Sequence, residues 1–248
     1  MTTAPSTDSW VRRYHPAPDV STRLVCFPHA GGSASFYFPV SAALNGVTEV
    51  AALQYPGRQD RHTEKGIDTI AELADRAHEA LRPCSDRPLV FFGHSMGAVL
   101  AFEVARRFEQ DGQGPVHVFA SGRRAPSTYR AENVHLRDDD GIIAEMRKLS
   151  GTDPRVLGND EVLRMVLPAI RSDYTAIENY RADPGATIAA PITVLTGDAD
   201  PRTTLDEARA WEQHTTGDFD LKVFPGGHFY LTEHVTEVIE VIRERLTA

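Results

Sequence analysis

The chain has 248 residues, of which 41 % are hydrophobic and 25 % charged, a composition typical of one globular domain with a substantial core. Its net charge of −9 at pH 7 argues against a general nucleic-acid-binding role, because phosphate binding needs a positive surface. We therefore expect the partner to be a small molecule or another protein.

Membrane and secreted proteins are also disfavoured as classes. No apolar run approaches the ~20 residues that a membrane-spanning helix needs, and no helical stripe rich in Lys and Arg is present to bind an anionic membrane. The N-terminal "MTTAPSTDSWVRRYHPAP" lacks the apolar segment of a signal peptide. The two cysteines, Cys26 and Cys84, indicate neither a disulfide framework nor a metal cluster, so a cytoplasmic location is expected.

Short apolar runs alternate with helical patterns along the chain. The apolar runs are rich in Val, Leu and Phe and end in Gly, Pro or a turn, as buried parallel strands do. They cover residues 23–30, 49–56, 88–95, 116–122, 191–197 and 220–227. Helical spacing of apolar residues predicts helices over 67–81 (with Asp68 as N-cap), 99–108 and 235–246. This alternation predicts an α/β fold with a mainly parallel sheet flanked by helices.

One long segment interrupts the alternation. The segment between Gly122 and Pro191 carries no strand pattern, but apolar residues keep helical spacing over 142–149 and again over 163–177, where a kink is expected at Pro168. We therefore expect a single domain over 1–248 with a helical lid insertion in this segment, since a pocket needs walls and this is the spare material. The alternative is a helical decoration with no gating role.

The stretch "LVFFGHSMGA", residues 89–98, contains the pattern G-x-S-x-G, with Ser95 between Gly93 and Gly97. In this motif a strand turns sharply into a helix, and the glycines relieve crowding while the serine hydroxyl is raised above the sheet. A strand pattern precedes Ser95 and a helix pattern follows it. Ser95 is therefore the predicted nucleophile, and a plain glycine-rich turn is the alternative.

A serine hydroxyl needs a base to remove its proton. His228 in "FPGGHFYL" is the candidate, because it follows the last predicted strand and such loops meet at one edge of a parallel sheet. Its alternative role is that of a solvated loop histidine. His94 is adjacent to Ser95, but neighbours on so tight a turn point apart, so we expect His94 to be a packing residue.

The base in turn needs an acid that holds its tautomer and stabilises the imidazolium. The segment "LTGDADP" follows the strand predicted at 191–197 and gives the chain order Ser, Asp, His that accompanies this serine motif. Asp200 is favoured because it has room to reach the loop of His228. Asp198 leaves the strand immediately and remains the alternate.

The oxyanion formed during acyl transfer needs preorganised N–H donors. One predicted donor is the backbone N–H of Met96, directly after the nucleophile. The other is the N–H of Ala30 in "FPHAGGSA", where Gly31 and Gly32 would let the backbone approach a substrate closely. A simple glycine-rich turn would explain the glycines but not their place after the first strand.

The segments "FPHAGGSA", "YPGRQDR", "GHSMGA", "TGDADP" and "PGGHFYL" together resemble the type II thioesterases, free-standing α/β-hydrolases of polyketide and nonribosomal peptide synthases. The resemblance extends from about residue 23 to the C-terminus. It implies the α/β-hydrolase fold, a Ser95–His228–Asp200 triad and donors at Ala30 and Met96. It also implies a flexible helical lid insertion at about 127–185 over an acyl chamber.

The resemblance also implies a substrate, an acyl group held as a thioester on the phosphopantetheine arm of an acyl or peptidyl carrier protein. Hydrolysis would clear aberrant or stalled acyl groups, and no metal or organic cofactor is required. Because carrier proteins are usually acidic and this chain is acidic too, docking would use a local basic patch, at Arg123–Arg124 or at Arg58 and Arg61, or apolar contacts of the lid.

Two other functions remain open at this stage. A general carboxylesterase or lipase of the same fold would use the same three residues. A catalytically silent hydrolase-fold protein would bind a ligand or partner, although intact Ser95, Asp200 and His228 argue against it.

Overall fold

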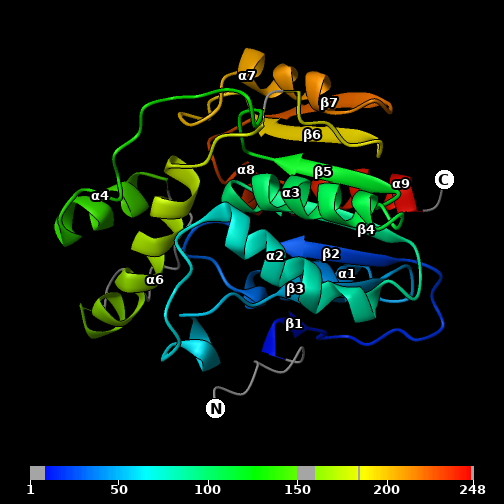
Figure 1. Cartoon of the computed structure of the whole chain (residues 1–248), viewed down its shortest axis with the longest axis horizontal. Helices are drawn as coiled ribbons and strands as arrows, with labels where there is room; N and C mark the ends of the chain where they lie inside the picture. The colour runs from blue at the N-terminus through cyan, green and yellow to red at the C-terminus, as the bar shows by residue number, and fades with distance from the viewer. Residues whose placement is uncertain (1–8, 150–159, 184, 247–248) are drawn as a thin grey trace.

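The computed structural model describes residues 9–149, 160–183 and 185–246 of the chain. At its centre is a seven-stranded sheet in the order β1-β3-β2-β4-β5-β6-β7 (Figure 1). The strands are β1 (Val11–Arg12), β2 (Arg23–Phe27), β3 (Glu49–Leu53), β4 (Leu89–His94), β5 (His117–Ser121), β6 (Ile192–Gly197) and β7 (Phe219–Phe224). All neighbouring pairs are parallel except β1 and β3. The predicted α/β fold with a mainly parallel sheet is thus confirmed.

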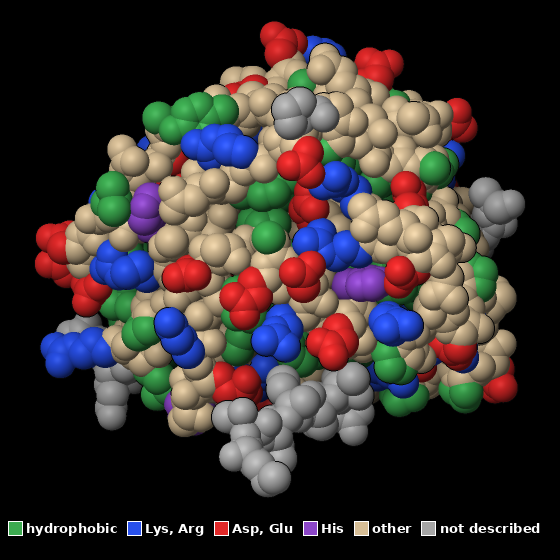
Figure 2. All heavy atoms as spheres, in the orientation of Figure 1, with side chains coloured by type: hydrophobic (Ala, Val, Ile, Leu, Met, Phe, Trp, Pro, Cys, Tyr) green, Lys and Arg blue, Asp and Glu red, His purple; other side chains and the backbone are tan. Residues whose placement is uncertain are grey.

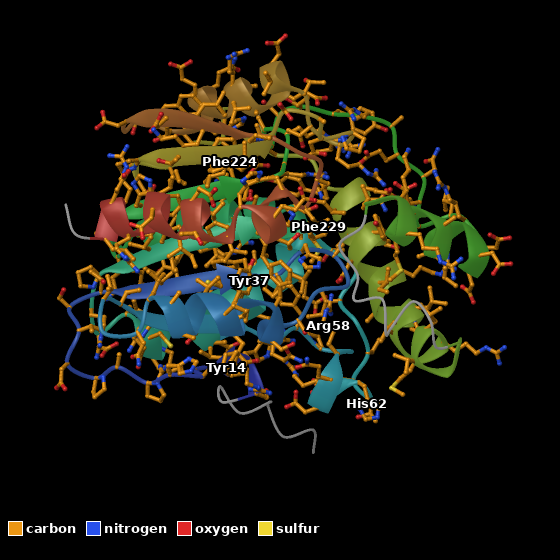
Figure 3. The ribbon with its side chains drawn as sticks, turned by 180° about the vertical axis from the view of Figure 1, so that it is seen from behind. Tyr14, Tyr37, Arg58, His62, Phe224 and Phe229 are labelled. Carbon is orange, nitrogen blue, oxygen red and sulfur yellow. The ribbon has the colours of Figure 1, made fainter. Side chains whose placement is uncertain are left out.

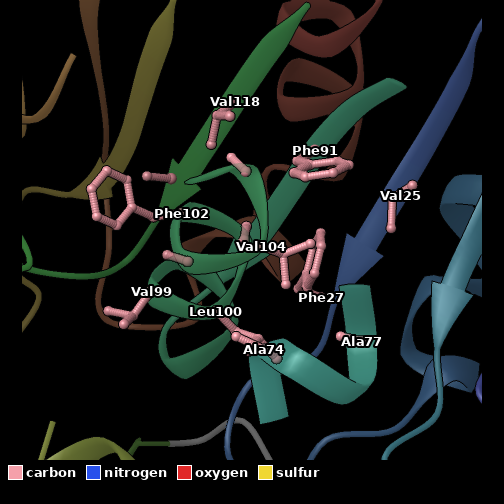
Figure 4. Close-up of a cluster of buried hydrophobic side chains, with 14 of the residues drawn as sticks. Val25, Phe27, Ala74, Ala77, Phe91, Val99, Leu100, Phe102, Val104 and Val118 are labelled. Carbon is pink, nitrogen blue, oxygen red and sulfur yellow. The ribbon is translucent and has the colours of Figure 1, made fainter. Parts of the chain in front are cut away.

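Helices cover both faces of this sheet. On one face lie α2 (Ile70–Leu81) and α3 (Met96–Gln110), whose apolar residues form one core cluster with β2, β4 and β5 (Figures 1 and 4). On the other face lie α1 (Phe38–Ala43), α8 (Tyr230–Glu233) and α9 (Val235–Leu246), which share a second cluster (Figure 3). The short α7 (Leu205–Arg209) lies beside the sheet near β6.

The strand register brings the segments after several strands to one edge of the sheet. Phe27 at the end of β2 pairs with Gly93 of β4, and His94 pairs with Ser121 at the end of β5. Gly197 at the end of β6 pairs with Phe224 at the end of β7. The turns that carry the predicted site residues therefore begin at neighbouring points.

Two helices of the region between β5 and β6 lie beyond this edge. They are α4 (Asp139–Leu149) and α6 (Asp160–Glu178), and Figure 1 shows them together on the side to which the strand arrowheads of β2, β5 and β6 point. Both correspond to predicted helices. Helix α6 continues through Pro168, and the kink there stays a prediction. Of the predicted lid, residues 150–159 and 184 lie outside the described residues.

One strand was missed and two local expectations were wrong. Strand β1 was not predicted, because two residues carry no periodicity. Strand β7 is only partly buried, since it lies at the edge of the sheet and carries Asp220 and Lys222. Helix α2 is capped by Thr69, whose hydroxyl accepts the Glu72 amide at 3.3 Å, and not by Asp68.

Cys26 and Cys84 are both free thiols and both buried.

Within the described ranges, none of the helices combines the length and the apolar character needed to cross a membrane.

Candidate active site

The turn between β4 and α3 holds Ser95 in an unusual backbone conformation. Its φ of 55° and ψ of −117° are costly for a residue with a side chain, and such strain occurs where a structure holds a functional group in place. A Cβ at Gly93 would lie 2.0 Å from the carbonyl oxygen of Gly97, and one at Gly97 would lie 2.0 Å from that of Phe27. Both positions therefore exclude any larger residue, which explains the two glycines of the motif.

His228 links Ser95 to Asp200. Its Nε2 lies 3.0 Å from Ser95 Oγ, and its Nδ1 lies 2.9 and 3.1 Å from the two carboxylate oxygens of Asp200. Both His228 and Asp200 are buried, while Ser95 remains partly exposed. An alcohol, an imidazole and a carboxylate in this order form a path along which the serine proton can be taken and the resulting imidazolium stabilised.

Asp198, the alternate acid, occupies a different place. It is exposed, and its Oδ1 accepts the backbone N–H of Gly226 at 2.9 Å. The amide of Ala199 donates to the Gly226 carbonyl at 2.9 Å, so the turn after β6 is tied to the loop that carries His228. Asp198 thus braces the loop, and Asp200 is the carboxylate in contact with the imidazole.

The loop after β2 brings Ala30 to the same site. Ala30 lines the cavity that contains Ser95 and His228, and Met96 is the first residue of α3. In the described part of the chain, no acceptor is hydrogen-bonded to the backbone N–H of Ala30 or of Met96. Two free amides beside a serine are the donors that a tetrahedral oxyanion requires.

Comparison with known proteins identifies relatives of this chain. The model of the thioesterase domain family matches residues 22–246. The chain is 59 % identical to the probable cadicidin biosynthesis thioesterase of Streptomyces griseus, over 99 % of this chain and 68 % of that protein. It is 48 % identical to thioesterase PikA5 of Streptomyces venezuelae, over 96 % and 85 % respectively. The chain belongs to the thioesterase family.

A solved structure extends this likeness to three dimensions. The type II thioesterase BorB from the borrelidin biosynthetic cluster superimposes with a TM-score of 0.91 at 51 % identity, covering 96 % of this chain and 98 % of that one. The expected type II thioesterase resemblance and the α/β-hydrolase fold are therefore confirmed, and the chain is a thioester hydrolase.

Charged side chains also support the loop after β2, which carries Ala30. Asp173 of α6 accepts the Gly31 amide at 2.7 Å and forms an ion pair with Arg58. Arg58 also donates to the Gly32 carbonyl at 2.9 Å. Both charged residues are buried, and Figure 3 shows Arg58 on the side of the body that faces α6. The loop that carries Ala30 is thus fixed by a helix of the insertion.

Two further buried histidines lie beside His228. The ring centroid of His94 is 5.1 Å from that of His228 and 5.9 Å from that of His29. Burial is the main cause that lowers the pKa of His29 to about 3 and the pKa of His94 well below its usual range, so both rings are neutral at pH 7. His94 Nδ1 lies 2.9 Å from Ser121 Oγ, so His94 is positioned by the core rather than by Ser95. The sequence patterns gave no signal for His29 except its place in the glycine-rich loop.

The cavity at Ser95 is narrow and is shared by the body and the insertion. Its free volume is about 560 Å³, including the part open to solvent. Met146 and Leu149 of α4 and Tyr174 and Ile177 of α6 form one wall. Helices α4 and α6 therefore limit the size of the acyl group that fits beside Ser95 in this conformation.

The arginines expected to dock an acidic partner are not on the surface. Arg58, Arg61, Arg123 and Arg124 are all buried, and Arg58, Arg61 and Arg124 form ion pairs with Asp173, Glu64 and Glu132 respectively. The expected basic patches were wrong, because these side chains hold loops together instead of facing solvent. On the face shown in Figure 2, acidic and basic side chains are interspersed.

Within the described residues no cluster of three or more His, Cys, Asp or Glu side chains is arranged to hold a metal ion.

Proposed function

We propose that Ser95, His228 and Asp200 hydrolyse acyl thioesters carried on the phosphopantetheine arm of an acyl or peptidyl carrier protein. The observation that carries the proposal is the unbroken contact from Ser95 Oγ through the His228 ring to Asp200. The partner class is the one that the resemblance to type II thioesterases implies, and the relatives named for cadicidin biosynthesis and for the borrelidin biosynthetic cluster support it. Clearing aberrant or stalled acyl groups from a synthase would restore the free carrier thiol.

The residues account for each step of this hydrolysis. His228 takes the proton of Ser95, whose Oγ attacks the thioester carbonyl, and Asp200 stabilises the imidazolium. The amides of Ala30 and Met96 donate to the oxyanion. The imidazolium then protonates the departing thiolate, water deprotonated by His228 attacks the acyl-serine, and the acid is released. None of these steps needs a metal or an organic cofactor.

We further propose that the helical segment at 127–185 acts as a lid over the acyl chamber. Support comes from α4 and α6, which supply one wall of the narrow cavity, and from Asp173, which links α6 to the oxyanion loop. A cavity this narrow gains room for longer acyl groups only when such a wall moves.

We also propose a cytoplasmic location. The free thiols of Cys26 and Cys84 are compatible with a reducing compartment.

Replacement of Ser95 tests the proposal directly. Ser95→Ala is expected to lower the turnover of an acyl carrier protein by ~10⁴-fold or more, as in other triads, while the circular dichroism spectrum stays unchanged. Mass spectrometry of a propionyl-loaded carrier protein before and after enzyme addition measures this loss. Turnover close to that of the wild type in this variant would exclude Ser95 as the nucleophile.

Two controls separate the alternative functions. A general esterase would cleave a simple aryl ester at least as efficiently as the acyl carrier protein, whereas we expect the carrier-bound thioester to be preferred. A catalytically silent protein would not react with a fluorophosphonate probe at Ser95. We expect labelling of the wild type and none of Ser95→Ala.

A further inference from the structure

A second hydrogen-bonded chain lies in the core beside the catalytic residues. Tyr230 Oη lies 2.7 Å from Ser121 Oγ, and Ser121 Oγ lies 2.9 Å from His94 Nδ1. All three side chains are completely buried. The hydrolysis proposed above uses none of them, although a polar group in the core costs free energy unless it is paired.

This chain joins the segments that carry the nucleophile and the base. His94 is the last residue of β4, directly before Ser95, and Ser121 is the last residue of β5. Tyr230 is the first residue of α8, two positions after His228. The backbone N–H of Ser95 also donates to the Ser121 carbonyl at 2.8 Å. Ser121 therefore connects the backbone of the nucleophile to the segment that follows the base.

The loop of His228 has open space directly before the histidine and a firm anchor after it. A Cβ at Gly227 would meet no atom within 4 Å. Tyr230, in contrast, stacks on Phe224 with ring centroids 5.1 Å apart, and its hydroxyl contacts Ser121. Because a reacting group must be held to a fraction of an ångström, this anchor bears on the position of the His228 ring.

The same chain sets the position of a ring that packs against His228. The ring centroids of His94 and His228 lie 5.1 Å apart, and the Phe229 ring lies 5.0 Å from the first and 5.2 Å from the second. Ser121 holds His94 at Nδ1. His228 is thus supported through its backbone by Tyr230 and through its ring by His94.

The donors and acceptors of the chain match best in one direction. Burial is the main cause that lowers the pKa of His94 well below its usual range, so its neutral ring carries one N–H at pH 7. If Tyr230 donates to Ser121 and Ser121 donates to His94 Nδ1, the group left unpaired within the described residues is His94 Nε2–H. The reverse direction would leave both the Tyr230 O–H and the Nε2 lone pair unpaired, which is more costly.

We propose that His94, Ser121 and Tyr230 are positioning residues, whose hydrogen-bonded chain runs from the Tyr230 hydroxyl to His94 Nδ1 and holds the His228 imidazole in its reactive orientation toward Ser95. The inference rests on the proposed hydrolysis and adds three residues that support its base. They act through His228 and do not contact the reacting atoms, so they should affect kcat more than KM.

Tyr230→Phe and Ser121→Ala break the chain while removing one oxygen each. Both should lower kcat for the carrier-bound thioester by ~10- to 100-fold, the cost of misplacing a reacting group by ~1 Å, with little change in KM. The downfield proton NMR signal of the hydrogen between His228 Nδ1 and Asp200 should weaken in both variants, because this hydrogen bond depends on the orientation of the ring.

Thr193→Val is the matched control. The Thr193 hydroxyl lies 2.9 Å from Nε2 of His117, which is at the opposite end of β5 from Ser121. This variant therefore also removes a buried contact between a hydroxyl and an imidazole. It should lose stability in urea unfolding as Ser121→Ala does, but it should keep the kcat and the His228 signal of the wild type.

Two substitutions of His94 test the hydrogen bond at Nδ1. Asparagine carries an oxygen that can accept the Ser121 hydroxyl, whereas leucine offers no acceptor. His94→Asn is therefore expected to keep more of the wild-type kcat than His94→Leu. Equal kcat values in the two variants would exclude a role for this hydrogen bond.

Wild-type kcat and an unchanged His228 signal in both Tyr230→Phe and Ser121→Ala would overturn the inference and leave the proposed hydrolysis intact. Absence of hydrolysis by the wild type would instead contradict the proposed function. If the variants do not fold, nitrogen NMR of His94 in the wild type decides the matter. Nε2 should be protonated and Nδ1 should be an acceptor at pH 7, and a proton on Nδ1 would overturn the proposed chain.

Discussion

At the scale of single residues, the environment of the two aspartates after β6 distinguishes their roles. Asp200 is buried against His228 Nδ1 and also accepts the Arg202 amide at 2.8 Å, so its carboxylate cannot turn away from the ring. Asp198 is exposed, and its carboxylate accepts the Gly226 amide. The sequence did not decide which aspartate is the acid, because their spacing of two residues does not indicate which side chain turns inward.

The different environments of Asp200 and Asp198 predict different effects of asparagine substitutions. Asp200→Asn should lower kcat by ~10³–10⁴-fold, because an amide no longer favours the His228 tautomer that accepts the serine proton. Asp198→Asn should keep kcat within ~10-fold, since an asparagine oxygen can still accept the Gly226 amide. Steady-state hydrolysis of the same carrier-bound thioester measures both. A larger loss in Asp198→Asn than in Asp200→Asn would reverse the assignment.

The limits of sequence analysis at this scale follow from tertiary contacts. Ser95, His228 and the two glycines beside Ser95 carry local signals, because a sharp strand–helix turn restricts which residues fit. Asp173 carries none, since its importance depends on its contacts with Gly31 and Arg58, which the fold brings together. The predicted basic patches, at Arg123–Arg124 and at Arg58 and Arg61, were wrong for the same reason. The sequence does not show that these side chains are buried in the fold.

At the scale of elements, long periodic segments were predictable and short or edge elements were not. The parallel strands and α2, α3 and α9 have apolar patterns that follow from burial on a known face. Strand β1 pairs antiparallel with β3, and no local sequence pattern records this pairing. The insertion was recognised by the absence of strand patterns, but no sequence pattern showed its contact with the loop that carries Ala30.

That contact is the basis of a prediction for α6. Asp173→Asn removes the charge that balances buried Arg58, which should weaken the attachment of α6 by about 3 kcal/mol. Hydrogen exchange should then become faster in α6 but not in β4 or β5, and kcat/KM should fall because the loop of Ala30 loses its support. The double variant Arg58→Met/Asp173→Leu should recover most of the exchange protection, since no unpaired charge remains.

Ser172→Ala is the matched control for this experiment. Its hydroxyl bonds within α6 to the Pro168 carbonyl at 3.0 Å, so its removal should leave the attachment of α6 unchanged. Equal exchange in Asp173→Asn and Ser172→Ala would show that the ion pair does not hold the helix.

At the scale of the whole molecule, several buried histidines make folding sensitive to acid. Burial is the main cause that lowers the pKa of His29 to about 3 and of His117 to about 4, and the pKa of His94 lies well below its usual range. Each is neutral in the folded chain and becomes protonated in the unfolded chain below pH ~6.5. Their contribution to stability is therefore complete above pH ~6.5 and is lost progressively as the pH falls toward the folded pKa.

The size of this effect can be predicted for one histidine remote from the catalytic contacts. His117 is buried on β5, where its Nε2 lies 2.9 Å from Thr193 Oγ1. At pH 5.5, one unit below the unfolded pKa, it should cost about 1.4 kcal/mol of the free energy of unfolding. In urea unfolding at pH 7.5 and 5.5, His117→Gln should therefore lose about 1.4 kcal/mol less than the wild type. His62→Gln, at an exposed position, should follow the wild type, and an identical pH dependence in all three proteins would show that His117 does not contribute to the acid sensitivity of the fold.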